Sequence, residues 1–342
     1  MIKKWVAFFI LLFLFPYIVN ADLKKVISIA SDNLDYLFFV IAGAVIDEQN
    51  NVFVCDSRGS FIRKYDWQGR FIKEIGKYGQ GPGDFSNAIS GLFLNRDLYL
   101  LDNGNNRIVE IDRELNIKRY IKIERPAQKI LKYGDRFYMV SRKGDQSFFE
   151  IGIYDRDGNP LEYFFDRHPG YLEKVESSKI GFVISLIYST IATAMDRETG
   201  EIAVTFQWPG ESIEIFIYSK EGQFTKKITV DHLIKYNFPE FRLKGLPSVL
   251  KFPGRSNLIM LRSIHYLTPS RLLLEYWVSE FELDKVAEEK EYILIIDKNT
   301  GKVVHKEALT TKIGILDVRG NYVCGVLAEA EVPQITVYRL SY

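Results

Sequence analysis

The chain has 342 residues and is nearly balanced in charge, with 45 Lys and Arg against 44 Asp and Glu and a formal net charge of +1. Without any basic or acidic block, this balance argues against a nucleic-acid groove and against a strongly charged membrane-binding surface. Aromatic residues make up 14% of the chain, with 24 Gly and 11 Pro, which favours many short β-strands joined by turns.

Residues 1–21 have the pattern of a secretory signal peptide. Lys3 and Lys4 precede an apolar run from Trp5 to Val19, and Ala21 is a small residue at the expected cleavage position. The run is shorter than the ~20 residues that a bilayer span needs, which favours cleavage over the alternative, a retained anchor. We therefore expect a mature chain of residues 22–342 outside the cytoplasm, without a membrane span, as a monomer.

A short pattern recurs through the mature chain: a strand that ends in an aromatic residue or Ile, then a polar residue, then a turn. The recurrences are Tyr65–Gly69, Ile111–Leu115, Tyr154–Gly158, Tyr218–Gly222 and Ile296–Gly301. Each predicts a hairpin turn between the third and fourth strands of one repeat, because Asp or Ser starts such turns and Gly supplies their positive φ.

A pair of strands is predicted upstream of each turn. The clearest pairs are Gly43–Asp47 with Val52–Asp56, Gly91–Leu94 with Leu98–Asp102, and Ile191–Met195 with Ile202–Phe206; the other repeats begin at Ile130, Val249 and Ile315. Six repeats of four short strands predict an all-β fold, a six-bladed β-propeller that forms a single domain. The last repeat ends on a third strand, Gln334–Leu340, so we expect Leu23–Ile29 to supply the fourth and close the ring.

One stretch has a recognisable relative. The loop from Gly76 to Phe85, followed by Leu98–Asp102 and Asn105–Ile108, resembles an NHL repeat, and the likeness extends over residues 43–123. It implies a six-bladed propeller of the kind common among secreted bacterial proteins.

The glycine loop itself suggests a structural role. Gly79, Gly81 and Gly83 would allow backbone conformations closed to other residues, and Phe85 would wedge between two blades. A phosphate-binding loop is the alternative, but such loops lead into a helix, whereas this one leads into the strand Gly91–Leu94.

Other polar motifs are also interpreted as structural. Asp102 is expected to cap its own loop or pair with Arg107, because one carboxylate is too few for a tight calcium site. Cys55 and Cys324 fall at matching places in the first and last repeats, and two buried free thiols are favoured over a disulfide.

Catalytic constellations are scarce. His168, His232, His265 and His305 are not at metal-ligand spacing, so we predict surface histidines, no metal and no cofactor. Two long connections interrupt the repeats, at Asp166–Ser189 and at Ser263–Glu291. The second is either a functional insertion or a strand of the fifth blade that extends beyond the disc, with Glu288–Glu291 as a solvated turn, and both interpretations stay open.

These observations favour a non-enzymatic binding or scaffold module that presents one propeller face to a protein, peptide or glycan. The alternative is a metal-dependent hydrolase or lyase with a site on the propeller axis. The candidate binding face carries the glycine loop, and its candidate contacts are Arg58, Arg107, Tyr266 and Trp277, since Arg and aromatic residues contribute most to interfaces.

Overall fold

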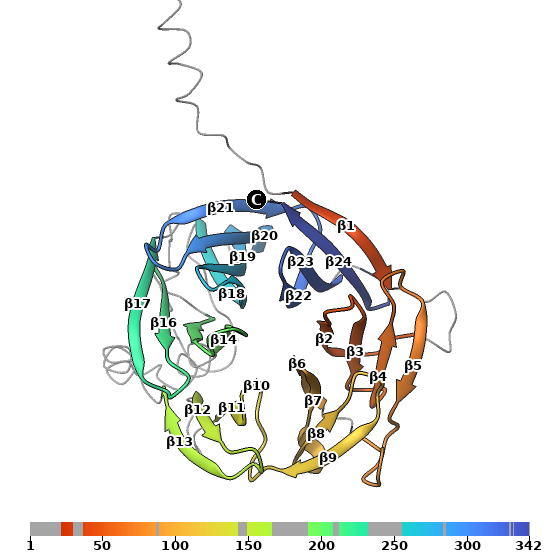
Figure 1. Cartoon of the computed structure of the whole chain (residues 1–342). Coiled ribbons are helices and arrows are strands. Elements are labelled where there is room, and N and C mark those ends of the chain that lie inside the picture. The colour runs from red at the N-terminus through yellow and green to blue at the C-terminus, as the bar shows by residue number, and fades with distance from the viewer. Residues whose placement is uncertain are drawn as a thin grey trace, which may run out of the picture.

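The computed structural model describes residues 22–29, 37–86, 89–142, 149–165, 191–207, 212–231, 255–282, 285–327, 330 and 332–341. Its strands form six four-stranded antiparallel sheets that surround a central axis as the blades of a propeller (Figure 1). The six-bladed fold predicted from the repeats is therefore confirmed. The described residues contain a single short 3-10 turn, η2 (Asn103–Asn105), and no helix long and apolar enough to cross a membrane.

The blades follow one another along the chain. Blade one consists of β2 (Ile41–Ile46), β3 (Val52–Asp56), β4 (Phe61–Tyr65) and β5 (Phe71–Ile75). Blade two consists of β6 (Ile89–Asn95), β7 (Asp97–Asp102), β8 (Arg107–Ile111) and β9 (Ile117–Lys122). Blade three consists of β10 (Lys129–Tyr133), β11 (Arg136–Arg142), β12 (Phe149–Tyr154) and β13 (Pro160–Phe164).

The second half repeats the same order. Blade four consists of β14 (Ile191–Met195), β15 (Ile202–Phe206), β16 (Ser212–Tyr218) and β17 (Phe224–Asp231). Blade five consists of β18 (Arg255–Thr268), β19 (Arg271–Glu282), β20 (Lys285–Asp297) and β21 (Val303–Leu309). Blade six consists of β22 (Ile313–Arg319), β23 (Tyr322–Leu327), β24 (Gln334–Ser341) and the N-terminal strand β1 (Asp22–Ile29).

Strand β1 is the outermost strand of the last blade. It pairs antiparallel with β24, from Asp22 opposite Ser341 to Ile29 opposite Ile335, with an irregularity between Lys25 and Ile27. Figure 1 shows the start of β1 beside the end of β24 in this sheet. Ile29 and Ile335 are buried in one cluster with residues of blade one, so the pairing also joins the last blade to the first.

The hydrophobic core is distributed between the blades. One cluster contains Phe53 and Ile62 from blade one together with Leu98 and Leu100 from blade two, all fully buried. Because strand side chains alternate between the two faces of a sheet, each blade can pack against both neighbours. Each such side chain stabilises the fold by ~1.5–3 kcal/mol through burial.

The predicted turns between third and fourth strands are present in the first five blades. In blade one the Asp66 carboxylate accepts hydrogen bonds from the backbone N–H groups of Gln68 and Arg70, both at 2.9 Å. Gly69 follows with a φ of 78°, which a side chain would disfavour.

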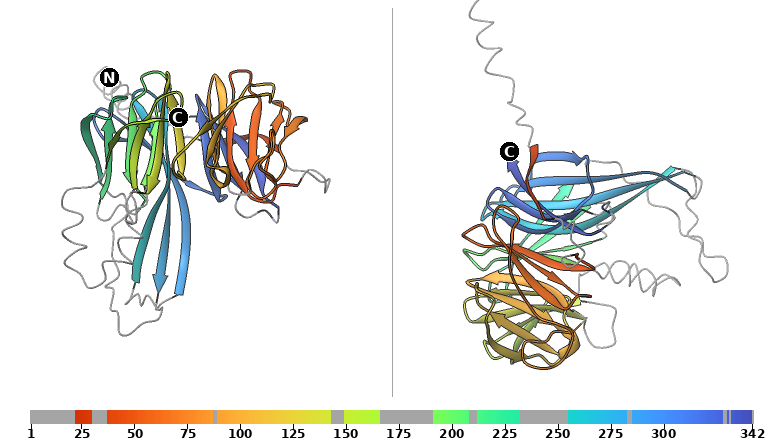
Figure 2. Two further views of the ribbon diagram at one scale, coloured as in Figure 1. Left: turned by 90° about the horizontal axis from the view of Figure 1, so that it is seen from below. Right: turned by 90° about the vertical axis from the view of Figure 1, so that its right-hand side faces the viewer.

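Three strands of blade five are much longer than the others. β18, β19 and β20 have 14, 12 and 13 residues, and they project beyond one face of the disc (Figure 2). We call the projecting part the blade-five arm, residues 255–260, 277–282 and 285–290. Strand extension is thus the correct interpretation of Ser263–Glu291, whereas the turn expected at 288–291 lies within β20. The other long connection, Asp166–Ser189, and the predicted blade start at Val249 lie outside the described residues.

Candidate functional site

The glycine loop folds back on itself before blade two begins. The Phe85 N–H donates to the Lys77 carbonyl at 2.7 Å, and the Gly79 N–H donates to the Phe85 carbonyl at 2.9 Å. The Phe85 ring is fully buried in the cluster between blades one and two. The predicted wedge between blades is confirmed.

The glycines of this loop are required for two different reasons. Gly83 has a φ of 83° and therefore uses glycine's conformational freedom, as predicted. Gly79 and Gly81 have no positive φ; instead, a Cβ atom would lie 2.4 Å and 3.0 Å from the Asp84 carboxylate. The expectation of unusual dihedrals at all three positions was wrong for these two.

Asp102 is the buried anchor of the same region. Its carboxylate accepts hydrogen bonds from the Ser86 backbone N–H at 3.0 Å, from Asn105 at 2.8 Å and from the Arg107 guanidinium at 2.9 Å. The expected partnership with Arg107 is therefore confirmed. The expected cap is not, because no backbone N–H of the turn Asn103–Asn105 donates to the Asp102 carboxylate. The equivalent residue of blade one, Asp56, accepts from the Phe39 and Gly59 N–H groups at 2.5 Å and 2.7 Å.

We call the side of the disc that carries these loops the glycine-loop face. Arg58 is exposed there, in the turn between β3 and β4. The Arg107 guanidinium already has several partners within the protein. Besides Asp102, it donates to the Asp84 carbonyl at 2.7 Å and stacks 4.4 Å from the Tyr120 ring centroid. Trp277 is half-buried where the arm leaves the disc, with the Arg262 guanidinium 5.6 Å from its ring.

Tyr266 does not share this face. It lies on β18 two residues before the strand ends at Thr268, and so near the opposite face of the disc. Its hydroxyl donates to Glu201 of blade four at 2.8 Å, and burial raises its pKa well above the usual range. Of the four candidate contacts, Arg58, Arg107 and Trp277 share a face and Tyr266 does not.

A cavity of about 610 Å³ lies on the propeller axis. Its walls come from the innermost strands of all six blades, β2, β6, β10, β14, β18 and β22, and from the turns that follow them. This volume is within the range of about 300–1,000 Å³ typical of small-molecule sites.

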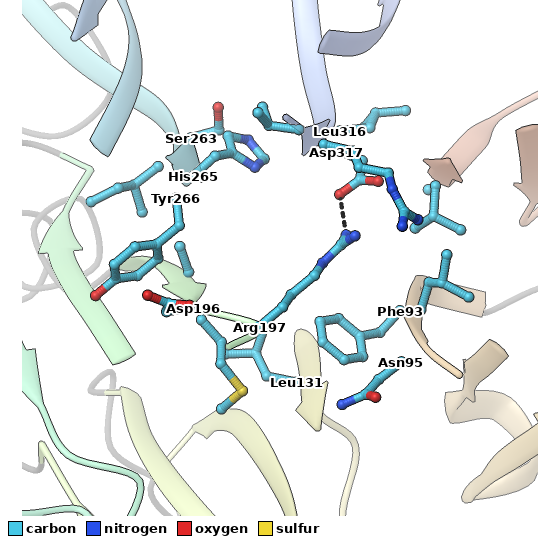
Figure 3. Close-up of a pocket in the computed structure, with 18 of the residues that line it drawn as sticks. Phe93, Asn95, Leu131, Asp196, Arg197, Ser263, His265, Tyr266, Leu316 and Asp317 are labelled. Atoms are coloured by element: carbon cyan, nitrogen blue, oxygen red, sulfur yellow. Dashed lines mark hydrogen bonds and ion pairs between the residues drawn. The ribbon is translucent and has the colours of Figure 1, made fainter. Parts of the chain in front are cut away.

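An ion pair crosses the cavity (Figure 3). Arg197, just after β14, reaches Asp317 on β22 at 2.7 Å, so blades four and six are linked past blade five. The other Asp317 oxygen accepts from the Ile46 N–H of blade one at 3.1 Å. Burial raises the pKa of Asp317, and Arg197 opposes that shift.

Among the described residues, three basic side chains of the cavity wall form no ion pair: Arg96, Lys129 and His265. Lys129 on β10 donates to the Thr193 carbonyl, and burial lowers its pKa to about 8. His265 on β18 points towards the axis in Figure 3, and its buried Nε2 has no hydrogen-bond partner. Burial, and then the positive charges of Lys129 and Arg197, lower the pKa of His265 to about 3.

The expectation of surface histidines is therefore wrong for both described histidines. His265 lines the cavity, and the His305 side chain is only 11% exposed, with Nε2 3.6 Å from Glu307. His168 and His232 lie outside the described residues. Among the described residues, no three His, Cys, Asp or Glu side chains gather into a group that could hold a metal ion. Cys55 and Cys324 are buried free thiols, as favoured from the sequence.

A buried carboxylate lies between blades five and six. Glu275 of β19 is 1% exposed, and it accepts hydrogen bonds from the Ser263 hydroxyl at 2.7 Å and from the Ile315 N–H at 3.0 Å. Burial raises its pKa to about 7 even though these donors and Arg262 favour the charged form. Glu291 likewise accepts a hydrogen bond from a backbone N–H of β22, that of Ile313, at 2.9 Å.

Sequence reasoning did not find Lys129, Arg197 or Asp317. Their only shared signal is position, because each lies on, or directly after, the first strand of a blade. That signal emerges only when the six repeats are aligned with one another.

No family model matches the sequence, and no curated protein matches it. Solved structures do match, and the following three are each similar over 94% of this chain. A member of the DUF4221 family from Bacteroides vulgatus has a TM-score of 0.58 and 8% identity, over 98% of its own chain. A Bacteroides fragilis protein inferred to be exported has a TM-score of 0.52 and 12% identity, over 95% of its own chain. Virginiamycin B lyase from Staphylococcus aureus has a TM-score of 0.48 and 12% identity, over 100% of its own chain. The first two likenesses establish the propeller fold and no narrower family, and the NHL resemblance has no family match behind it.

Proposed function

We propose that this protein is an extracytoplasmic, non-enzymatic binding module that engages a protein partner through the glycine-loop face and the blade-five arm. The location is supported by the leader pattern of residues 1–21, with cleavage after Ala21, and by the exported character inferred for the B. fragilis neighbour. The mature domain, residues 22–342, would act without a cofactor.

The observation that carries the proposal is the blade-five arm. β21 pairs with β20 only from Glu291 to Ile296, so residues 285–290 have no partner strand on that edge among the described residues. An unpaired strand edge offers backbone N–H and C=O groups, which suit a polypeptide partner better than a glycan.

Charge on the arm supports a specific partner rather than self-association. Glu288, Glu289 and Lys290 are exposed on β20, and charged side chains on an edge strand oppose the pairing of identical strands. Arg58 at the face and Trp277 at the base of the arm complete the proposed contact surface. A metal-dependent site on the axis is not favoured, since no metal-binding group is found among the described residues.

The test is site-specific photo-crosslinking in cells of the source organism. A photoreactive amino acid at Glu288 or Arg58 is expected to give a discrete adduct with another protein. The matched control is Leu161, which is 56% exposed on the outer strand of blade three, away from the proposed surface. No adduct from the arm, or the same adducts from Leu161, would overturn the proposal.

A further inference from the structure

Among the described residues, two cations of the axial cavity wall form no ion pair: Arg96, which is exposed, and Lys129, which is partly buried. Three guanidinium groups of its wall each have a carboxylate partner: Arg197 with Asp317 at 2.7 Å, Arg262 with Glu291 at 2.6 Å, and Arg319 with Glu48 at 2.8 Å. Lys129 forms no ion pair with a described residue; it donates to the Thr193 carbonyl, which satisfies one of its three donors. Burial lowers its pKa although the Asp317 charge opposes that shift, so the ammonium is incompletely stabilised, and an anionic ligand would stabilise it further.

The surroundings of Lys129 carry charges of both signs: the Asp317 carboxylate acts on Lys129, and the Lys129 and Arg197 charges act on His265. His265 on the same wall is held in its neutral form by burial and by the charges of Lys129 and Arg197. Its Nε2 is buried without a hydrogen-bond partner. The imidazole interacts with the Ile315 backbone, so Nε2 is its unused polar atom, on the cavity wall that also carries Lys129.

The rest of the wall is partly apolar. Phe93, Leu131 and Leu316 line the same cavity, and Figure 3 shows them around the Arg197–Asp317 pair. An inorganic anion would leave these surfaces without contacts, whereas an apolar group on the ligand would cover them.

We propose that the axial cavity binds an organic carboxylate that carries an apolar group, with the Lys129 ammonium as the cation that pairs with the carboxylate. The pairing is a charge-assisted hydrogen bond in a partly enclosed site, where such bonds are stronger than at the surface. This site is separate from the proposed arm surface, so either proposal can fail without the other.

Titration calorimetry with two probes, phenylacetate and N-acetylphenylalanine, tests the proposal on the full mature chain. Each probe is compared with its neutral amide, which has nearly the same shape. We expect the carboxylates to bind and the amides to bind about ten- to a hundredfold more weakly, the range for loss of a charge-assisted hydrogen bond.

Two lysine variants locate the binding. Lys129→Met is expected to weaken carboxylate binding by the same factor. Lys132→Met is the matched control, because Lys132 lies on the same strand but donates to the Gly134 carbonyl and does not line the cavity. If Lys129→Met does not fold, the comparison of acid with amide on the unmodified protein still decides. Equal affinity for acid and amide, binding unchanged by Lys129→Met, or no binding of either carboxylate at about 10 mM would each overturn the proposal.

Discussion

At the scale of single residues, carboxylates replace missing strand partners. The innermost strand of a blade has no neighbour on its axial side, and Glu275, Glu291 and Asp317 accept hydrogen bonds from such backbone N–H groups across blade boundaries. These acceptors satisfy donors that would otherwise be buried and unpaired, which costs about 1–3 kcal/mol each.

The raised pKa of Glu275, about 7 against 4.5 for an ordinary Glu, gives a prediction with a definite sign. Between these values the folded protein binds the proton more tightly than the unfolded chain does. Its free energy of unfolding should therefore rise as the pH falls from 7 towards 4.5, by at most about 1.4 kcal/mol per pH unit. Glu275→Gln removes this contribution, so the stability of the variant relative to the parent should decrease as the pH falls.

Urea denaturation at several pH values measures this difference. Glu288→Gln, at an exposed position of the neighbouring strand, is the matched control. A pH dependence of the Glu275→Gln difference no larger than that of the control would contradict the prediction.

At the scale of elements, the pairing of β1 with β24 predicts a large contribution of the N-terminal strand to stability. Removal of residues 22–29 would expose the edge of β24 and remove the contacts of Leu23, Ile27 and Ile29. We expect a loss of about 3–5 kcal/mol from the buried apolar surface alone. Thermal unfolding measures it.

A double variant, Lys24→Ala with Lys25→Ala, is the control, because both side chains are exposed on the same strand. It should melt near the parent temperature. A deletion variant that also melts there would show that the strand does not hold the ring together.

The blade-five arm gives a second prediction at this scale. Backbone amides in residues 285–290 have no β21 partner, whereas those in Glu291–Ile296 do. Hydrogen exchange should therefore be faster in the first segment than in the second, since protection follows backbone pairing and burial. Equal protection in the isolated protein would indicate that a second copy of the chain covers the arm.

The sequence predicts the blades better than the site. In five blades the third strand is followed by a turn that contains Gly or Asp, as at Asp66 and Gly69. These turns predict the number and order of the blades directly. The turn between β18 and β19 contains Pro269 and Ser270 and no Gly. The sequence pattern therefore does not indicate where β18 ends and β19 begins. Tyr266 was consequently assigned to the wrong face. Lys129, Arg197 and Asp317 converge only through closure of the ring, which no local pattern records.

At the scale of the whole molecule, the Arg197–Asp317 pair links two blades that are not neighbours. Arg197→Met would leave the buried Asp317 carboxylate with only backbone donors. We expect a loss of about 1–2 kcal/mol, less than for a fully buried pair because the Arg197 side chain is 34% exposed. Arg96→Met is the control, because Arg96 also lines the cavity wall but forms no ion pair with any residue that the structure describes. Equal stability of the two variants in urea would contradict a linking role.

Ring closure also fixes an order of events during synthesis. β1 precedes β24 by about 300 residues, so during synthesis β1 must wait for its partner. At about 5–20 residues per second, that wait is roughly fifteen seconds to a minute. Throughout it, the first strand has an unpaired edge, and no partial chain can complete the last blade. The same pairing that protects the finished ring therefore makes the unfinished chain vulnerable to aggregation and proteolysis, and the synthesis of β24 decides when that period ends.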